Sequence, residues 1–159
     1  MKTEILYVRT LQFDKVSYYT VKVSDRSYAE FEDFEIRLRD RQKQMAIIFR
    51  VIEQMGCLYG AKDIFFKKEN KLQPYCFISS SEKSNLELRL CCIKISDEIV
   101  ILLNGDIKTT SSIDKSVDGQ DHLIFAEKTA YGILNAIKEG FLEINGNDFL
   151  IEDGFVLNI

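Results

Sequence analysis

The sequence predicts an α+β fold, in which a mostly antiparallel sheet is packed by an N-terminal helix hairpin and followed by a C-terminal helix and a small β-tail. Runs rich in β-branched and aromatic residues are typical of strands. Apolar residues at helical spacing in the N-terminal half and over 122–139 indicate helices. The chain has 159 residues, of which 46% are hydrophobic and 29% charged, and this composition suits one soluble domain.

The first elements are two strands and a helix. Strands are expected near 4–9 and 16–23, paired with each other, because both segments are rich in strand-forming residues. Asp25 or Ser27 is expected to cap the helix that follows, with Glu30 as the capping-box partner of Ser27. The apolar residues of this helix follow its spacing: Phe31, Phe34 and Leu38.

A second helix is expected directly after the first. Asp40 can cap it, and Gly56 or Gly60 can end it. One face of this helix is apolar, formed by Met45, Ile48, Phe49, Ile52 and Met55. The join between the two helices is short, so the pair is predicted to form an antiparallel hairpin.

Four further strands are predicted in the middle of the chain. Short strands are expected at 65–68 and 75–78, and longer ones near 86–95 and 98–103. The dipeptide Asn104–Gly105 then predicts a turn. A polar segment from Ser79 to Asn85 is expected as a loop.

The C-terminal part is predicted to contain one helix and three short strands. A Ser- and Asp-rich stretch, 111–121, is expected as a loop and helix cap, and Gly140 fits the position that ends the helix. The apolar face of this helix comprises Leu123, Ala126, Ala130, Ile133, Leu134 and Ile137. The tail strands are expected at 141–144, 148–152 and 155–158, with type I′ turns at Asn145–Gly146 and Asp153–Gly154.

Charge is distributed unevenly along the chain. The net charge is −4, with 18 basic and 16 acidic residues in 1–113 but 3 basic and 9 acidic residues in 114–159. Proteins that bind nucleic acid strongly and without specificity usually have a basic surface. The overall balance therefore argues against that class, although it allows a local basic cleft.

Metal, cofactor and membrane functions have little support in the sequence. The four cysteines form no C-x-x-C pair and His122 is the only histidine, so we expect no metal and no cofactor, and reduced, mostly buried thiols. No apolar run is long enough to span a membrane, and the first residues lack a signal-peptide core, so a cytoplasmic protein without a membrane partner is expected. His122 is expected at a helix start, either as a surface or capping residue or as an acid catalyst.

The candidate functional residues lie in and around the two middle strands. Arg89 stands between apolar neighbours inside a strand, where a charge is costly unless it is paired or lines a working cleft. Lys108 follows the next strand, and Lys67 and Lys68 are nearby candidates for holding phosphates. Glu87 is on the same strand face as Arg89, so it could act as a base or simply neutralise the arginine.

A family resemblance rests on the order of these elements. The segment Leu86–Glu87–Leu88–Arg89 resembles the L-x-E-L-R-type strand of the RelE/ParE toxin superfamily, and the chain is most similar to its HigB-like members. The apolar run Ile99–Leu103 is followed by Ile107–Lys108–Thr109–Thr110, which resembles the Lys-Thr signature of the family. Alanines in the next helix, and the helix hairpin before these strands, stand in the expected order. The resemblance covers about 28–137.

The resemblance implies a toxin whose partners are an antitoxin protein and the ribosome with its mRNA. It divides the single domain, 1–159, into an N-terminal strand extension (1–27), a RelE/ParE-like core (28–140) and an acidic β-tail (141–159). It implies mRNA cleavage through Arg89, Lys108 and Glu87, with Lys67 and Lys68 binding RNA. The chain departs from the family in its acidity and in lacking the second lysine of a Lys-Lys-Thr motif. These departures keep an alternative open, a non-catalytic protein-interaction module on the same scaffold.

Overall fold

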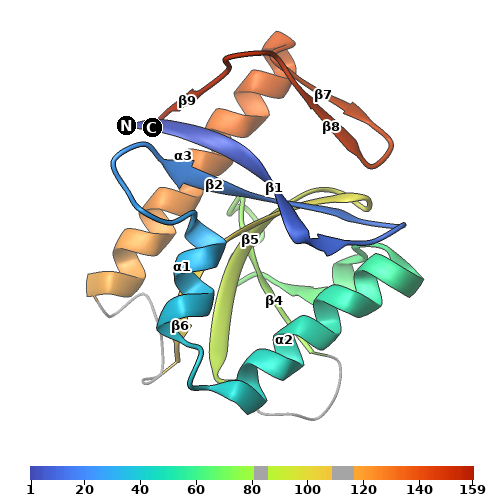
Figure 1. Cartoon of the computed structure of the whole chain (residues 1–159), viewed down its shortest axis with the longest axis vertical. Coiled ribbons are helices and arrows are strands. Elements are labelled where there is room, and N and C mark those ends of the chain that lie inside the picture. Colours follow the sequence, from blue (N-terminus) through green and yellow to red (C-terminus); the bar gives the residue numbers. More distant parts are fainter. Residues whose placement is uncertain (81–85, 109–116) are drawn as a thin grey trace.

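The structure, a computed structural model, describes residues 1–80, 86–108 and 117–159. In these ranges a seven-stranded sheet has helices on both faces (Figure 1). The strands of this sheet are β1 (Lys2–Gln12), β2 (Ser17–Val23), β3 (Phe66–Lys67), β4 (Cys76–Ile78), β5 (Leu88–Ser96), β6 (Ile99–Ile107) and β9 (Leu157–Asn158). The helices are α1 (Glu30–Arg37), α2 (Gln42–Gln54), α3 (Val117–Glu139) and two short ones, the π-helix η1 (Met55–Tyr59) and the 3-10 helix η2 (Asp63–Phe65). A separate hairpin consists of β7 (Leu142–Asn145) and β8 (Asp148–Ile151).

The strand order of the sheet is β3-β4-β5-β6-β2-β1-β9. β2 and β6 run parallel and every other described pair is antiparallel, so the predicted α+β class with a mostly antiparallel sheet is confirmed. The helix pair α1–α2 follows two strands rather than beginning the fold. The segment expected as an extension supplies β1 and β2, and β2 lies inside the sheet between β6 and β1.

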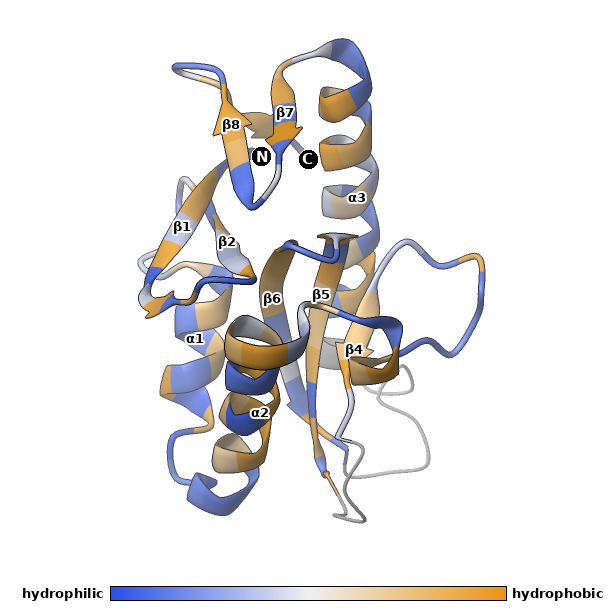
Figure 2. Cartoon of the chain, turned by 90° about the vertical axis from the view of Figure 1, so that its right-hand side faces the viewer, coloured by the Kyte–Doolittle hydropathy of each residue, from blue (hydrophilic) through white to orange (hydrophobic). Residues whose placement is uncertain are grey.

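Two apolar cores lie on opposite faces of the sheet. Figure 2 shows the sheet and its helices turned by 90°, with hydrophobic residues in orange. On one face α1 and α2 bury residues at helical spacing, including Phe31, Phe34, Met45, Ile48 and Ile52. On the other face α3 buries small residues, chiefly Ala126, Ala130 and Ala136, with Ile133. Alternating residues of β5 therefore belong to different cores, because successive side chains of a strand point to opposite faces.

Both predictions of helix caps are wrong. α1 begins after Ala29 and α2 begins after Arg41, and neither residue accepts a hydrogen bond with its side chain. Glu30 is buried, and its carboxylate accepts a hydrogen bond from the Asn104 amide. A carboxylate engaged in this way is not acting as a capping-box partner. The residues expected as caps lie before or between the helices: Asp25, Ser27 and Asp40.

The predicted turn at Asn104–Gly105 is also wrong, because β6 continues through it to Ile107. Gly105 pairs with Leu90 next to an irregularity in the β5–β6 register. A Cβ atom at Gly105 would lie 1.8 Å from the carbonyl oxygen of Arg89. Glycine is therefore required here for the close approach of two strands.

The C-terminal predictions hold in outline. Gly140 follows α3 with φ of 87°, and Gly146 lies between β7 and β8 with φ of 62°. The predicted type I′ turns at Asn145–Gly146 and Asp153–Gly154 are wrong, because such a turn needs a positive φ at both residues and no described residue other than glycine has one. β9, however, pairs with β1 and brings the two chain ends together (Figure 1). Leu134, expected on the buried face of α3, is 46% exposed. Within the described chain, no helix combines the length and apolar character that a membrane-spanning helix requires.

Candidate functional site

Arg89 lies on β5 on the face of the sheet that α3 covers further along. Its guanidinium carbon is 4.2 Å from the centre of the Phe77 ring. Its Nη2 atom donates to a carboxylate oxygen of Glu69, in the connection between β3 and β4. The Arg89 side chain is only 11% exposed. The charge within the strand is therefore stabilised by an ion pair and an aromatic face, as burial of a charge requires.

Arg89 belongs to a pocket of about 310 Å³ that gathers side chains from several segments. Lys67 reaches it from β3, and Lys108 reaches it from the residue after β6. The other lining residues are Glu69, Phe77, Ile78, Ser79, Ser80, Leu86 and Leu88. Three of the five candidate residues from the sequence thus lie around one depression, which we call the Arg89 pocket.

The other two candidates are not among the residues that line this pocket. Glu87 is exposed, and its backbone N–H donates to Gln44 Oε1 at 2.6 Å. Its carbonyl oxygen accepts a hydrogen bond of 2.7 Å from the backbone N–H of Lys108. The charge of Lys68 acts on Cys76 instead, where it helps to lower the pKa of the thiol. The carboxylate that neutralises Arg89 is Glu69, which sequence spacing could not identify because it lies 20 positions away.

Arg89 retains hydrogen-bonding capacity toward a ligand. A guanidinium has five N–H donors in a planar fork, a shape that matches phosphate and carboxylate oxygens. Of the guanidinium atoms of Arg89, only Nη2 donates a hydrogen bond to a described residue. The acceptor is Glu69, whose side chain is 38% exposed. An anion entering the pocket could therefore bind the remaining N–H donors of Arg89. It could also replace Glu69 as the acceptor, and the displaced carboxylate would then be hydrated by water.

A second polar site was not expected from the sequence. Arg37 of α1 donates from Nε to Asp33 at 2.9 Å, and from Nη2 to Asn104 Oδ1 at 2.5 Å and the Gly105 carbonyl at 2.7 Å. The Asn104 amide in turn donates to Asp33 at 2.8 Å and to Glu30 at 3.1 Å. We call this group the Asn104 network. The only sign of this network in the sequence is Asn104, a polar residue that directly follows the apolar run Ile99–Leu103.

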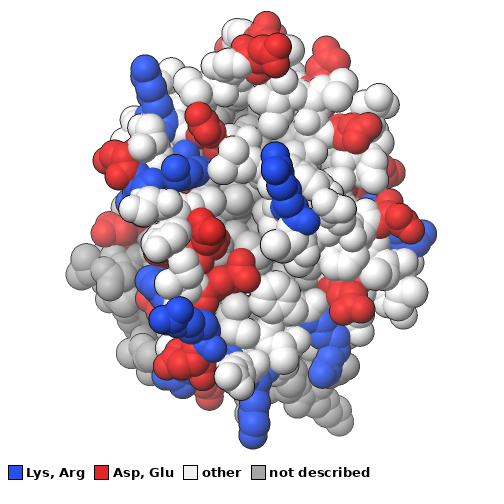
Figure 3. Space-filling model, in the orientation of Figure 1, with Lys and Arg blue, Asp and Glu red and all other residues white. Residues whose placement is uncertain are grey.

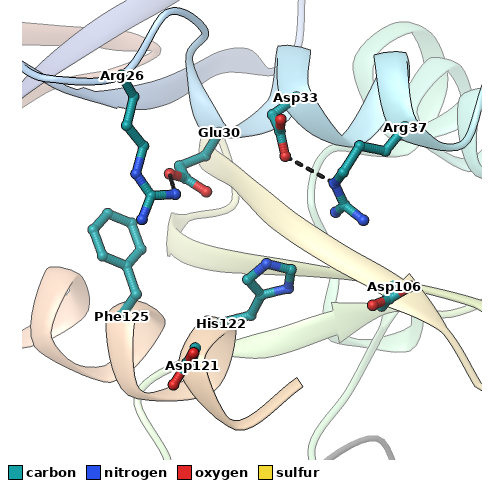
Figure 4. Close-up of a pocket in the computed structure, with 8 residues that line it drawn as sticks. All are labelled: Arg26, Glu30, Asp33, Arg37, Asp106, Asp121, His122 and Phe125. Carbon is teal, nitrogen blue, oxygen red and sulfur yellow. Dashed lines mark hydrogen bonds and ion pairs between the residues drawn. The ribbon is translucent and has the colours of Figure 1, made fainter. Parts of the chain in front are cut away.

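The Asn104 network forms one wall of a pocket of about 290 Å³ (Figure 4). His122 projects into it from α3, and Asp106 from β6. The Nδ1 atom of His122 is buried and has no hydrogen-bond partner among the described residues. Burial, followed by the charge of Arg37, lowers the pKa of His122. The neutral form of the histidine is thus favoured by its surroundings, and His122 is not among the residues that line the Arg89 pocket.

The hydrogen bonds of the Asn104 network stabilise its charged groups and indicate a structural role. Burial acts to raise the pKa of Asp33, but hydrogen bonds from Asn104 and Arg37 outweigh it, so the pKa of Asp33 is lowered. Each polar group has a partner within the network, which is the condition for a stable buried polar cluster. The network therefore fixes α1 to β6 and leaves little capacity for a ligand.

The described residues contain no group of three or more potential metal ligands. Figure 3 shows basic and acidic side chains interspersed over the face it presents. The charge on that face gives no continuous basic surface for a nucleic-acid duplex. Comparisons of the chain with protein-family models, curated proteins and solved structures found no match.

Proposed function

We propose that this chain is a RelE/ParE-like toxin of a toxin–antitoxin system, acting in the cytoplasm, and that the Arg89 pocket binds the scissile phosphate of an mRNA on the ribosome. The observation that carries the proposal is the convergence of Lys67, Arg89 and Lys108 on one pocket. These residues come from three strands of the sheet or their ends, so their proximity is a product of the fold. Lysine and arginine side chains gathered in one pocket are suited to an RNA backbone.

The reaction we propose is attack of a ribose 2′-oxygen on the adjacent phosphorus, with departure of the 5′-oxygen, which takes a proton from water. It places extra negative charge on the phosphate oxygens in the transition state. Arg89 would stabilise that charge with its fork of N–H donors, and its ring contact with Phe77 holds the fork in place. Lys67 and Lys108 would hold the flanking phosphates.

The base that removes the 2′-proton has two carboxylate candidates. Glu87, proposed from the sequence, is exposed next to the backbone of Lys108. Glu69 lines the pocket and contacts the guanidinium. A base must come within hydrogen-bond reach of the proton it removes. Glu69 lines the same pocket as Arg89 and Glu87 is not among its lining residues, so we favour Glu69.

An antitoxin would inhibit such a site by covering the pocket and supplying negative charge to Arg89. Glu69 already supplies one such charge within the chain. The same ion pair supports the alternative function, a non-catalytic protein-interaction module in which Arg89 is a structural residue. The two functions make different predictions for a chain produced without a partner.

The test is induced expression in bacteria of the wild type, Arg89→Ala, Lys108→Ala and a matched control, Lys128→Ala. Lys128 is an exposed lysine of α3 outside the pocket. Growth and the 5′-ends of cellular mRNA are measured at equal soluble protein levels. We expect arrest and new mRNA ends with the wild type and the control. Arg89→Ala should lower cleavage at least about 100-fold, the usual effect of removing one transition-state donor.

Two outcomes would contradict the proposal. If the wild type leaves growth and mRNA intact, the chain is not an active nuclease and the interaction module becomes the better description. If the wild type cleaves mRNA but both pocket variants cleave it equally well, the Arg89 pocket is not the catalytic site. Circular dichroism of each purified variant separates these outcomes from loss of folding.

A further inference from the structure

Two cysteines face each other across the strand pair that forms the back of the Arg89 pocket. Cys76 of β4 and Cys92 of β5 are direct cross-strand partners. Their sulfur atoms are 3.7 Å apart, and each sulfur also lies within 3.7 Å of the partner's carbonyl oxygen. Both residues are buried in the core under α2. Directly opposed residues on antiparallel strands have Cβ atoms close to the separation that a disulfide needs.

The other two cysteines lack this arrangement. Cys91 follows along the same strand but points into the core on the opposite face, under α3. Cys57 is exposed on the π-helical segment Met55–Tyr59 that continues α2. Cys76 and Cys92 are therefore the one pair of thiols in contact among the described residues.

The two thiols of the pair also differ in acidity. The hydrogen bond with Cys92, opposed by burial and aided by the charges of Lys68 and Lys94, lowers the pKa of Cys76. Burial raises the pKa of Cys92. The thiolate is the reactive form of cysteine, so Cys76 would be the attacking sulfur and Cys92 the resolving one. Both thiols are buried, so the oxidant would reach them when the short strand β4 opens locally at the side of the sheet.

We propose that Cys76 and Cys92 form a reversible disulfide when the protein meets a peroxide, and that this bond fastens β4 to β5 behind the Arg89 pocket. The Cys76 thiolate attacks one peroxide oxygen, which gives a sulfenic acid and releases hydroxide. The Cys92 thiol then attacks the sulfenic sulfur, the S–S bond forms, and water leaves. Two thiols are oxidised and one peroxide is reduced to two waters, so atoms and electrons balance.

The position of the pair links the bond to the pocket. β4 has three residues and only the two-residue β3 lies beyond it, so this side of the sheet is held by few hydrogen bonds. The disulfide would close the loop from Cys76 to Cys92, which contains both Phe77 and Arg89. Closing a loop restricts the unfolded chain and opposes separation of the two strands. The oxidised protein should therefore hold Phe77 and Arg89 together more persistently.

The experiment uses a Cys57→Ser/Cys91→Ala chain, which keeps only the two thiols of interest. The folded protein is treated with hydrogen peroxide, denatured, and alkylated with N-ethylmaleimide before mass spectrometry. We expect a monomer that has lost two hydrogen atoms and takes up no maleimide, a tryptic fragment linking the two cysteines, a higher urea midpoint, and reversal of all three by dithiothreitol.

The matched control is the converse variant, Cys76→Ser/Cys92→Ala, which should form no intramolecular disulfide. A third variant, Cys92→Ser, keeps a hydrogen-bonding group beside Cys76, and its Cys76 should accumulate as a sulfenic acid that dimedone captures. The proposal is overturned if Cys76 and Cys92 both remain alkylatable at a peroxide dose that fully oxidises the exposed Cys57 of the wild type. Formation of the bond without a rise in the urea midpoint would overturn its fastening role.

Discussion

Two arginines, Arg37 of α1 and Arg89 of β5, make different kinds of contact. Arg37 donates three hydrogen bonds to protein acceptors, one of them the buried amide oxygen of Asn104. Arg89 donates to one carboxylate, Glu69, and rests on an aromatic ring. The acceptors of Arg37 are joined to one another through Asn104, which donates to Asp33 and accepts from the Gly105 N–H, whereas Glu69 lies on the exposed connection between β3 and β4. The difference separates a guanidinium that holds the fold together from one that can bind an anion.

Gly105 contacts both arginines, because its carbonyl accepts from Arg37 and its Cα approaches the Arg89 backbone. Replacing Gly105 should have the largest effect on stability. In Gly105→Ala the new Cβ would meet the backbone carbonyl of Arg89, which no side-chain rotation can relieve. We expect a loss of about 3 kcal/mol or more in the free energy of unfolding, measured in urea, because β5 and β6 must separate.

The matched control for this prediction is Gly132→Ala inside α3. A Cβ there meets its nearest neighbour, Leu157 Cδ2, at an ordinary 3.5 Å. Alanine in a helix interior is favoured over glycine by about 0.5–1 kcal/mol, so this variant should be as stable as the wild type or more so. Equal stability of the two alanine variants would show that β5 and β6 do not approach closely at Gly105.

Asn104→Ala should have the next largest effect and would test whether the Asn104 network is structural. The change leaves Glu30 buried without its amide donor and removes an acceptor of Arg37. Loss of a partner by buried polar and charged groups costs about 2–4 kcal/mol. The measurement is again urea unfolding, with retention of the wild-type midpoint as the result that contradicts the prediction.

A direct comparison of the arginines should give a smaller but more specific result. Arg37→Met should lower the free energy of unfolding by about 1–2 kcal/mol, because Asn104 Oδ1 and the Gly105 carbonyl lose a donor. Arg89→Met should lower it by less than about 0.5 kcal/mol, because Glu69 is hydrated and methionine keeps the contact with Phe77. Thermal and urea unfolding of the two proteins side by side would show the order, and the reverse order would make Arg89 the structural residue.

The sequence predicts much of this fold because its strands and amphipathic helices are local patterns. Residues of α2 such as Ile48 and Ile52 repeat at helical spacing whatever their distant neighbours are, and they are buried as expected. Asn104–Gly105 was misread as a turn because the same dipeptide also suits a close approach of two strands. Only the strand that pairs with it, β5, decides between the two, and that partner is not visible in the local sequence.

The candidate site shows the same limit. Arg89 was identifiable because a charge inside an apolar strand is unusual at any single position. Its partners, Glu69 and Phe77, come from another part of the sheet, and their sequence neighbours carry no comparable signal. Glu87 was chosen for its place on the same strand, which is a weaker guide than three-dimensional contact. Residues 81–85 and Thr109 and Thr110 of the Lys-Thr motif lie outside the described residues.

The smallest effect we predict is a pH dependence that distinguishes the arginines without altering the fold. His122 has a pKa below its ordinary value of 6.5, because of its burial and then the charge of Arg37. The unfolded chain therefore binds a proton at a higher pH than the folded one, so stability should fall as the pH drops below about 6.5. An NMR titration of the imidazole, the only one in the chain, should give a midpoint below that of the protein in urea. Arg37→Met should raise the midpoint and Arg89→Met should leave it unchanged; an equal response to both would mean that the two guanidinium groups are not electrostatically distinct at His122.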